Sequence, residues 1–501
     1  MNRTWRSIFG GVTLATLALV TGCSSNRELP RRISESLDGI ARSSHSGQFL
    51  YVDPGTPGLP QATLYPVRRS LLGWELALPA VPVNLGRNGV APPFEKREGD
   101  GRTPAGIFPL RTAFGYPATL PGTFPYRQVD THDLWVDDPQ SPDYNRWVWR
   151  GETRASSFEE LLRPDPLYRY ALALDYNTEP AVRDMGSAIF IHVERGPESG
   201  TAGCVSLPEK ELVRVIGWLD PEQRPQVVIG SASAVAAASA GVAAQLPDDL
   251  PAGLKERLSQ GGRLLALRRG AGGFFAAAVS LPDSVGRLMR EKQSWRPECP
   301  VPLDQLAYLV TSFWGFDGQP HYGELVVHQV LAAFFMDSLH HAYNGRFPIE
   351  RMELIDAFDA DDFRSMDANN SSAFNCREVP GRPGVFSRHS YGAAIDINPR
   401  QNPYLMLEEG ARQQGASVAG AAAARDFCLG NPALCRVLPA ASADHLDRQQ
   451  PRPGMLQPGD PLLTPFRQRG FTWGGSWRFP DYQHLEYDLG RLLQGDETTP
   501  R

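Results

Sequence analysis

A stretch made almost only of alanine and serine constrains the fold of this chain more than any other feature. It is "SASAVAAASAGVAAQ", residues 231–245. Such a run offers too little apolar surface for a core of its own and is typical of a linker. At roughly 150 residues per domain, the 501 residues also suggest about three domains. We therefore expect a multidomain protein with separate domains on the two sides of this linker.

The segment before the linker, residues 46–230, has the pattern of a mainly β domain. "YRYALALDY" and "SAIFIHV" predict strands, and the second is short and apolar enough to be buried. "LPEKELVRVIGWLD" predicts a helix with Pro208 in its first turn. "PQVVIGS" predicts a closing strand.

The segment after the linker has the pattern of an α+β domain over residues 299–495. "LVVHQVLAAFFMDSL" predicts a helix packed on a small sheet, because its apolar residues recur at helical spacing. These residues are Val327, Val330, Leu331, Phe334, Phe335 and Leu339. Residues 246–298 are compatible with a connector or a small subdomain, and "ARQQGASVAGAAAARD" with a surface loop or a short helix.

The first residues predict export. Two arginines, an apolar run over residues 8–20 and small residues are typical of a secretory signal, and the run is too short for a comfortable membrane span. "LVTGC" resembles the lipobox of bacterial lipoproteins. This implies removal of residues 1–22, lipidation of Cys23 and a polar tether over residues 23–45. Because Ser24 follows, it also implies the outer membrane, facing the periplasm; an ordinary signal peptide is the alternative.

Composition excludes one class of partner. The formal net charge is -6 and no run of basic residues occurs, so we expect no binding to nucleic acid.

The cysteine count singles out one thiol. The six cysteines are Cys23, Cys204, Cys299, Cys376, Cys428 and Cys435. Without the lipidated one, five remain, an odd number in a compartment that permits disulfides. The four after residue 298 can pair among themselves in three ways, between which the sequence does not choose. Cys204 is left as the expected free thiol.

The surroundings of Cys204 suggest nucleophilic chemistry. "IFIHVERGPESGTAGCVSL" places His192 at the end of an apolar run and Cys204 after a turn of small residues. A thiol nucleophile needs a base, which His192 can supply. Gly203 lets the backbone turn sharply, so that nearby N–H groups could form an oxyanion site. On spacing alone, a structural cysteine and a core histidine remain the alternative.

Residues 80–230 resemble the L,D-transpeptidase catalytic domains of peptidoglycan enzymes. The motifs that carry the resemblance are "REGDGRTPAGIFPL", "DLWVDDPQSPDYNRWV", "IFIHV" and "SGTAGCVSL". It implies a small, mainly β domain in which Cys204 forms a thioester with a stem peptide and His192 activates the thiol. Many members have an arginine where this chain has Ser206, and Arg183 or Arg195 could substitute for it.

A second group of residues has the composition of a metal site. "SRHSYGAAIDINP" holds His389 and Asp396, and "DYQHLEY" holds His484. Two histidines and a carboxylate with an open fourth position form a catalytic zinc set. Asp481 could act as general base on a zinc-activated water, with Glu486 as the rival carboxylate. Ordinary capping or core histidines are the alternative for an isolated pattern of this kind.

Residues 299–490 resemble the D-alanyl-D-alanine carboxypeptidase family of zinc peptidases, which includes L-alanyl-D-glutamate endolysins. The motifs are "GELVVH", "FPIERM", "SMDANNSSAFNCR", "SRHSYGAAIDINPRQNPY" and "WGGSWRFPDYQHLEY". The resemblance implies that His389, Asp396 and His484 bind Zn²⁺ and that Asp481 is the acid/base. It also implies that Arg377 holds the substrate or stabilises the oxyanion.

Together the two resemblances imply a bifunctional cell-wall lipoprotein that acts on peptidoglycan stem peptides. The first domain would be an L,D-transpeptidase, and the second a zinc peptidase that cleaves D-Ala–D-Ala or L-Ala–D-Glu bonds. The alternative is a peptidoglycan-binding or anchoring lipoprotein whose cysteine domain is catalytically impaired. Ser206 favours that alternative, whereas the intact nucleophile and ligand residues disfavour it.

Overall fold

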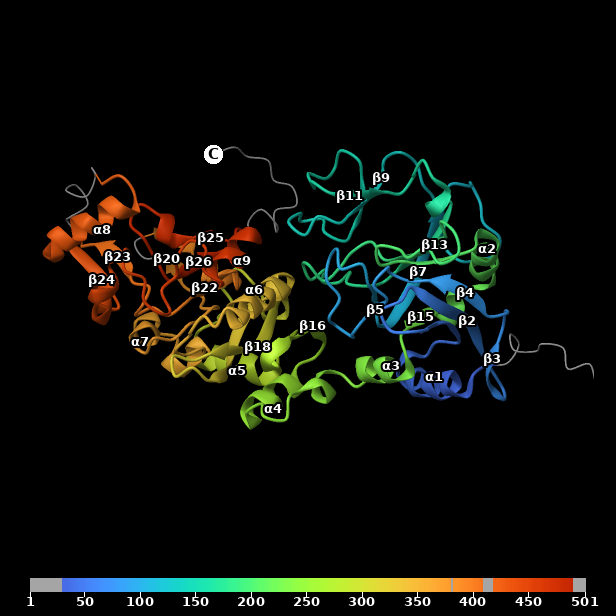
Figure 1. Ribbon diagram of the computed structural model, residues 1–501, viewed down its shortest axis with the longest axis horizontal. Coiled ribbons are helices and arrows are strands. Elements are labelled where there is room, and N and C mark those ends of the chain that lie inside the picture. Colours follow the sequence, from blue (N-terminus) through green and yellow to red (C-terminus); the bar gives the residue numbers. More distant parts are fainter. Residues whose placement is uncertain (1–28, 380–381, 409–417, 490–501) are drawn as a thin grey trace, which may run out of the picture.

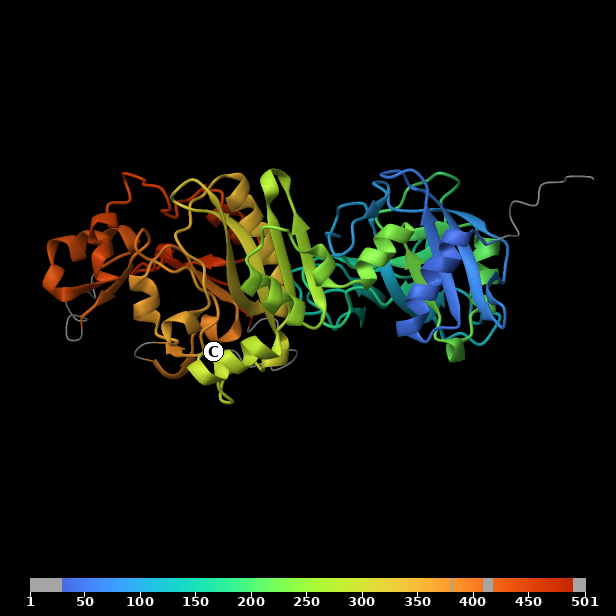
Figure 2. The same ribbon diagram turned by 90° about the horizontal axis from the view of Figure 1, so that it is seen from below.

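The structure is a computed structural model that describes residues 29–379, 382–408 and 418–489. Cys23 and the lipidation motif lie outside the described residues. The chain forms a mainly β domain and a mixed α/β domain, which lie side by side along the long axis of the molecule (Figures 1 and 2). In the described part, no helix is long and apolar enough to cross a membrane.

The first domain is built on a sheet that closes on itself. Its order is β1-β15-β7-β12-β13-β14-β4-β2-β3, with β8 beside β7, and β1 pairs with both β15 and β2. The strands are β1 (Gln48–Pro54), β2 (Gln61–Ser70), β3 (Gly73–Leu76), β4 (Val81–Asn84), β7 (Gly106–Gly115), β8 (Tyr126–Gln128), β12 (Tyr170–Leu174), β13 (Phe190–Val193), β14 (Val205–Leu207) and β15 (Gln226–Ile229). Apolar side chains fill the interior, as in other barrels. The prediction of a mainly β domain is confirmed.

Two small sheets complete this domain. One has the order β10-β9-β11, and the other is a parallel pair of very short strands. Their strands are β9 (Asp133–Val136), β10 (Trp147–Trp149), β11 (Phe158–Glu160), β5 (Val90–Ala91) and β6 (Thr103–Pro104). The three predicted strands correspond to β12, β13 and β15, and the predicted helix to α2 (Glu209–Trp218), which begins directly after Pro208.

The expected tether and linker both contain packed helices. α1 (Arg31–Ser44) buries Ile33, Leu37 and Ile40, which recur on one helical face. α3 (Ala232–Ser239) lies in the alanine/serine stretch and buries Val235 in the same apolar cluster. Alanine has the highest helix propensity, so such a stretch forms a helix where Val235 can pack against α1 and the barrel.

The second domain is built on an antiparallel sheet of order β16-β17-β18-β19. Its strands are β16 (Leu264–Arg269), β17 (Phe275–Ser280), β18 (Leu306–Trp314) and β19 (Pro320–His328). α6 (Ala332–Asn344) covers one face, and α4 (Ala252–Gln260) and α5 (Asp283–Lys292) cover the other. The domain therefore begins well before residue 299, since β16 and β17 supply half of this sheet.

The helix predicted around residues 325–339 is wrong in its first part. Residues up to His328 belong to β19, where Val326 and Val327 pair with Tyr308 and Ala307 of β18. Only from Ala332 does α6 begin. A strand buried on both faces is continuously apolar, so its pattern merges with that of the following helix.

The remaining elements form smaller units beside this sheet. A three-stranded sheet has the order β22-β26-β25, and two antiparallel strand pairs, β20-β21 and β23-β24, accompany it. The elements are β20 (Glu378–Val379), β21 (Arg382–Phe386), β22 (Ala394–Asp396), β23 (Tyr404–Leu407), β24 (Cys435–Leu438), β25 (Thr472–Trp473), β26 (His484–Glu486), α7 (Asp362–Asp367), α8 (Ala421–Gly430) and α9 (Leu463–Gln468). α8 shows that the described end of the predicted surface loop is a short helix.

The cysteines pair as two disulfides within the second domain. Cys299 bonds Cys376, and Cys428 bonds Cys435. Among the described cysteines, Cys204 alone is free, and it is buried. The prediction of the free thiol is confirmed, and the pairing that the sequence left open is decided.

Candidate active sites

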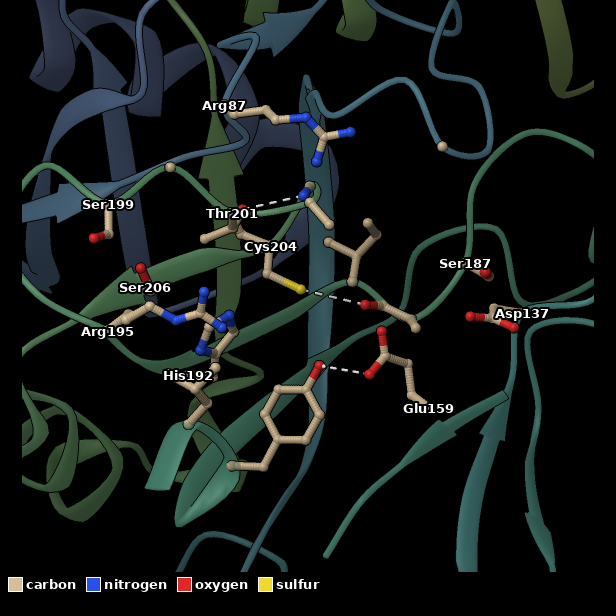
Figure 3. A pocket seen from close by; sticks show the side chains of 18 of the residues that line it. Arg87, Asp137, Glu159, Ser187, His192, Arg195, Ser199, Thr201, Cys204 and Ser206 are labelled. Carbon is tan, nitrogen blue, oxygen red and sulfur yellow. Dashed lines mark hydrogen bonds between the residues drawn. The ribbon is translucent and has the colours of Figure 1, made fainter. Parts of the chain in front are cut away.

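Cys204 and His192 face one pocket of the first domain. Cys204 directly precedes β14, and His192 lies on the neighbouring parallel strand β13, where it is opposite Ser206. Both line a cavity of about 610 Å³ (Figure 3). The parallel pairing of these two strands thus brings together residues that are twelve positions apart in the sequence.

Each of the two groups has its own backbone partner. The Cys204 thiol donates to the Ala188 carbonyl at 3.3 Å and accepts from the Phe190 N–H at 3.4 Å. His192 Nδ1 lies 2.8 Å from the Val193 carbonyl, which can only accept, so Nδ1 carries the proton and Nε2 is left as a base. Among the hydrogen bonds of the described residues, none joins Cys204 to His192.

Burial keeps both groups neutral. It raises the pKa of Cys204 to about 12 and lowers the pKa of His192 to about 4. Desolvation always disfavours the charged form, which is the thiolate in one case and the imidazolium in the other. Near pH 7 the pocket therefore holds a thiol beside a neutral imidazole. If this thiol acts as a nucleophile, it has to lose its proton during the attack on a substrate rather than before it.

The turn before Cys204 leaves little space for a side chain at Gly203. A Cβ at this position would lie 3.0 Å from the Arg102 carbonyl oxygen. The Gly203 N–H donates to Thr201 Oγ1 at 3.1 Å, and this hydroxyl donates to the Cys204 carbonyl at 2.7 Å. The N–H predicted to face an oxyanion is thus held by Thr201, and it must leave this hydroxyl to take that role.

The pocket also contains groups that the motifs do not reveal. The Tyr168 hydroxyl donates to Glu159 at 3.3 Å, and its ring packs edge-on against His192 at 5.4 Å. Both residues come from segments without any chemical signature in the sequence.

Two arginines were candidates to replace the arginine that many family members have at the position of Ser206. Arg195 lines the pocket. Arg183 does not line it and instead donates to the Pro139 carbonyl.

His389, Asp396 and His484 converge in the second domain. Asp396 and His484 lie opposite each other on the paired strands β22 and β26. Asp396 is 3.0 Å from His484 Nδ1 and 3.3 Å from His389 Nε2, and these two nitrogens are 3.1 Å apart. The potential ligand atoms all lie within 4.8 Å of one another.

The hydrogen bonds around the cluster show that it fits a cation. His389 Nδ1 faces the Ala373 carbonyl, which can only accept, so Nδ1 carries a proton. His484 Nε2 is 3.1 Å from the Glu486 carboxylate, so Nε2 carries a proton as well. The two inner nitrogens therefore present lone pairs to each other beside a carboxylate, which is favourable only around a positive charge. A set of two histidines and one carboxylate, each histidine oriented by an outer partner, suits Zn²⁺.

The carboxylates around His484 also favour positive charge, which is either a proton on Nδ1 or a metal ion bound to Nδ1 in its place. Burial lowers its pKa, but the hydrogen bonds to Asp396 and Glu486 outweigh this and raise the pKa of His484 to about 10. The position between these groups thus strongly favours positive charge.

Asp481, Arg377 and Glu486 line one cleft of about 930 Å³ together with Asp396 and His484 of the cluster. Asp481 has a buried carboxylate oxygen without a hydrogen-bond partner, and burial together with Asp396 raises the pKa of Asp481 to about 7. Arg377 forms an ion pair with Asp362 at the cleft. Glu486 contacts the outer nitrogen of His484, so it is placed to orient this ligand rather than to serve as the base.

Two families match different parts of the chain. Residues 68–229 match the family model described as L,D-transpeptidase catalytic domain, and residues 380–487 match the one described as D-alanyl-D-alanine carboxypeptidase. Both predicted resemblances are confirmed, in the predicted order. No curated protein and no solved structure gave a significant match. The cysteine pocket lies within the first match, and the histidine–aspartate cluster within the second.

The buried thiol predicts a characteristic alkylation profile. Because its pKa is about 12, Cys204 should react with iodoacetamide more slowly than a free thiol near pH 7. The rate should rise about tenfold per pH unit until that pKa is approached. Mass mapping at several pH values measures this, with His192→Ala as the comparison. A profile with a midpoint near 8.5 contradicts the environment described, and labelling that His192→Ala leaves unchanged counts against His192 as the base.

The cluster predicts metal binding with unequal contributions from its residues. His389→Ala should abolish stoichiometric zinc, since two ligands bind zinc poorly. Glu486→Gln should retain zinc but weaken its affinity by about 10–100-fold, because it alters only the orientation of His484. Elemental analysis and competition with a chelator measure both. Full zinc content in His389→Ala would remove this residue from the ligand set.

Proposed function

We propose that the chain is a bifunctional peptidoglycan-remodelling enzyme with a cysteine acyltransferase site and a zinc peptidase site. The family matches support action on peptidoglycan peptides by both domains. The observation that carries the proposal is the presence, in one chain, of two separate and complete reactive sets. These are the Cys204–His192 pocket and the His389–Asp396–His484 cluster.

The cysteine site suits L,D-transpeptidation through a thioester. As Cys204 Sγ attacks a stem-peptide carbonyl, His192 Nε2 accepts the thiol proton and then gives it to the departing amine. An acceptor amine next attacks the thioester, its proton passes to His192, and the thiol is regenerated. Arg195 lines the same pocket and supplies a cation for a substrate carboxylate.

The second site suits hydrolysis of a stem-peptide bond. Zinc bound there would supply Lewis-acid activation of a water and of the scissile carbonyl. Asp481 accepts a proton from the attacking water and delivers it to the amine that leaves. Arg377 faces the cleft and suits a substrate carboxylate or the developing oxyanion. D-Ala–D-Ala and L-Ala–D-Glu bonds are the candidate substrates.

One observation favours an alternative in which the cysteine domain only binds peptidoglycan. The Ser206 hydroxyl is buried at the pocket without a hydrogen-bond partner, where the resemblance leads us to expect an arginine. In that case only the zinc site would turn over.

Single-site variants separate the two activities. Cys204→Ala should abolish cross-link exchange and leave peptide hydrolysis intact. Asp481→Ala should keep its zinc and lose hydrolysis by about 10²–10⁴-fold, the usual contribution of an acid/base. Mass spectrometry of defined muropeptides, with metal measured on the same samples, detects both. Full hydrolysis by Asp481→Ala removes Asp481 from the mechanism and reopens the role of Glu486, which the contact with His484 argues against. Wild-type hydrolysis that survives complete metal removal overturns the zinc assignment. Absence of exchange in the wild type favours the binding alternative.

We also propose that lipidation of Cys23 anchors the protein in the outer membrane, facing the periplasm. The support is "LVTGC" after the apolar run. Cys23→Ser should lose lipid labelling and move from the membrane to the soluble fraction, because several acyl chains are needed for stable anchoring. Unchanged fractionation of this variant would contradict the proposal.

A further inference from the structure

The two domains share a buried ionic cluster. Asp337 on α6 of the second domain is only 3 % exposed. Its carboxylate lies 3.2 Å from Arg97, 3.3 Å from Arg268 and 3.7 Å from Arg469. Arg469 also lies 3.9 Å from Asp184. Arg97 and Asp184 belong to the first domain, so charges from both domains compensate one another away from water.

Backbone and apolar contacts surround this cluster. The Leu267 N–H donates to the Phe94 carbonyl at 3.1 Å, and the Arg183 N–H to the Val330 carbonyl at 2.9 Å. Val182 and Met185 of the first domain lie in the apolar core of the second. The interface is therefore part of one continuous apolar core and not a contact between the surfaces of two separately folded domains.

Two segments of the first domain form this interface, residues 94–98 and residues 182–188. The first of them, which contains Arg97, also forms a wall of the cysteine pocket. Lys96 and Glu98, which flank Arg97, line the cavity around Cys204. Lys96 Nζ donates to the Arg97 carbonyl at 2.7 Å, and its side chain packs against the turn at Gly203, where a Cβ would lie 3.6 Å from Lys96 Cε.

The second segment, residues 182–188, contacts the Cys204 thiol directly. The Glu98 N–H donates to the Asp184 carbonyl at 2.8 Å, and the Ser187 hydroxyl donates to the Glu98 carboxylate at 2.7 Å. The next residue, Ala188, accepts the hydrogen bond of the Cys204 thiol. A continuous series of contacts therefore runs from Asp337 to Cys204.

We propose that the second domain is a structural part of the cysteine site, and that Asp337 acts through Arg97 as a positioning residue for the two segments that surround Cys204. Asp337 touches neither the thiol nor the pocket. The inference rests on the proposed role of Cys204, but its test measures the thiol directly and so can fail independently of that role.

Two matched variants of the full chain test this inference. Arg97→Met and Arg268→Met each remove one of the three guanidinium partners of Asp337 and leave the other two. Only Arg97 lies on the pocket segment, because Arg268 is on β16 of the second domain. Zinc content and melting temperature establish that each variant is folded under the assay conditions.

The readout is the pH dependence of Cys204 alkylation. Arg97→Met should loosen both segments and admit water, which moves the alkylation midpoint down by at least about one pH unit and speeds the reaction about tenfold at neutral pH. Transpeptidation should fall at the same time. Arg268→Met should keep the wild-type midpoint even where its melting temperature falls equally, and Arg97→Lys should restore part of the profile.

Three outcomes overturn the inference: a wild-type midpoint in folded Arg97→Met, an equal shift in Arg268→Met, or no recovery in Arg97→Lys. If Arg97→Met does not fold, hydrogen exchange of residues 94–103 in Arg97→Gln decides, because this variant keeps a polar side chain but loses the ion pair with Asp337. Unchanged protection there excludes the positioning role. If Arg97→Met shifts the midpoint while Cys204→Ala retains transpeptidation, the positioning stands and the proposed nucleophile is wrong.

Discussion

The buried carboxylate of Asp337 is the interaction on which the arrangement of the two domains depends. A charge withdrawn from water must be compensated, and leaving such a group without a partner costs several kcal/mol. Part of the compensation for Asp337 comes from Arg97 in the other domain. Separation of the domains would therefore expose apolar core residues and remove Arg97 from Asp337, so the chain is not two independent domains on a flexible linker.

Burial has opposite consequences in the two sites. Around Cys204 and His192 it removes charge, because the hydrogen bonds from the Phe190 N–H to the thiol and from His192 to the Val193 carbonyl offset only part of the desolvation of the charged forms. Around Asp396 it concentrates a carboxylate and two nitrogen lone pairs, which together require a cation. The same desolvation thus produces a site for proton transfer in one domain and a site for metal in the other.

The sequence predicted which residues lie together in the two candidate sites far better than it predicted their surroundings. Cys204, His192, His389, Asp396 and His484 lie in short motifs whose residue types are rare outside reactive sites, and counting cysteines identified the free thiol. The helical state of residues 31–44 and 232–239 depends on apolar contacts with each other and with the barrel, which local composition does not reveal. Arg97 and Asp337 are 240 positions apart, so no local pattern could pair them. Glu159 and Tyr168 were missed for the same reason.

The protected thiol explains how an odd cysteine can persist in an oxidising compartment, where the proposed anchor would place it. Disulfide exchange and oxidation proceed through the thiolate, so a thiol whose pKa is raised by burial is a poor partner for either. The other described cysteines are already closed in disulfides within the second domain. Since Ala188 and the segments joined to Asp337 hold Cys204 in its buried, protonated state, the contact between the domains also protects the nucleophile until a substrate enters.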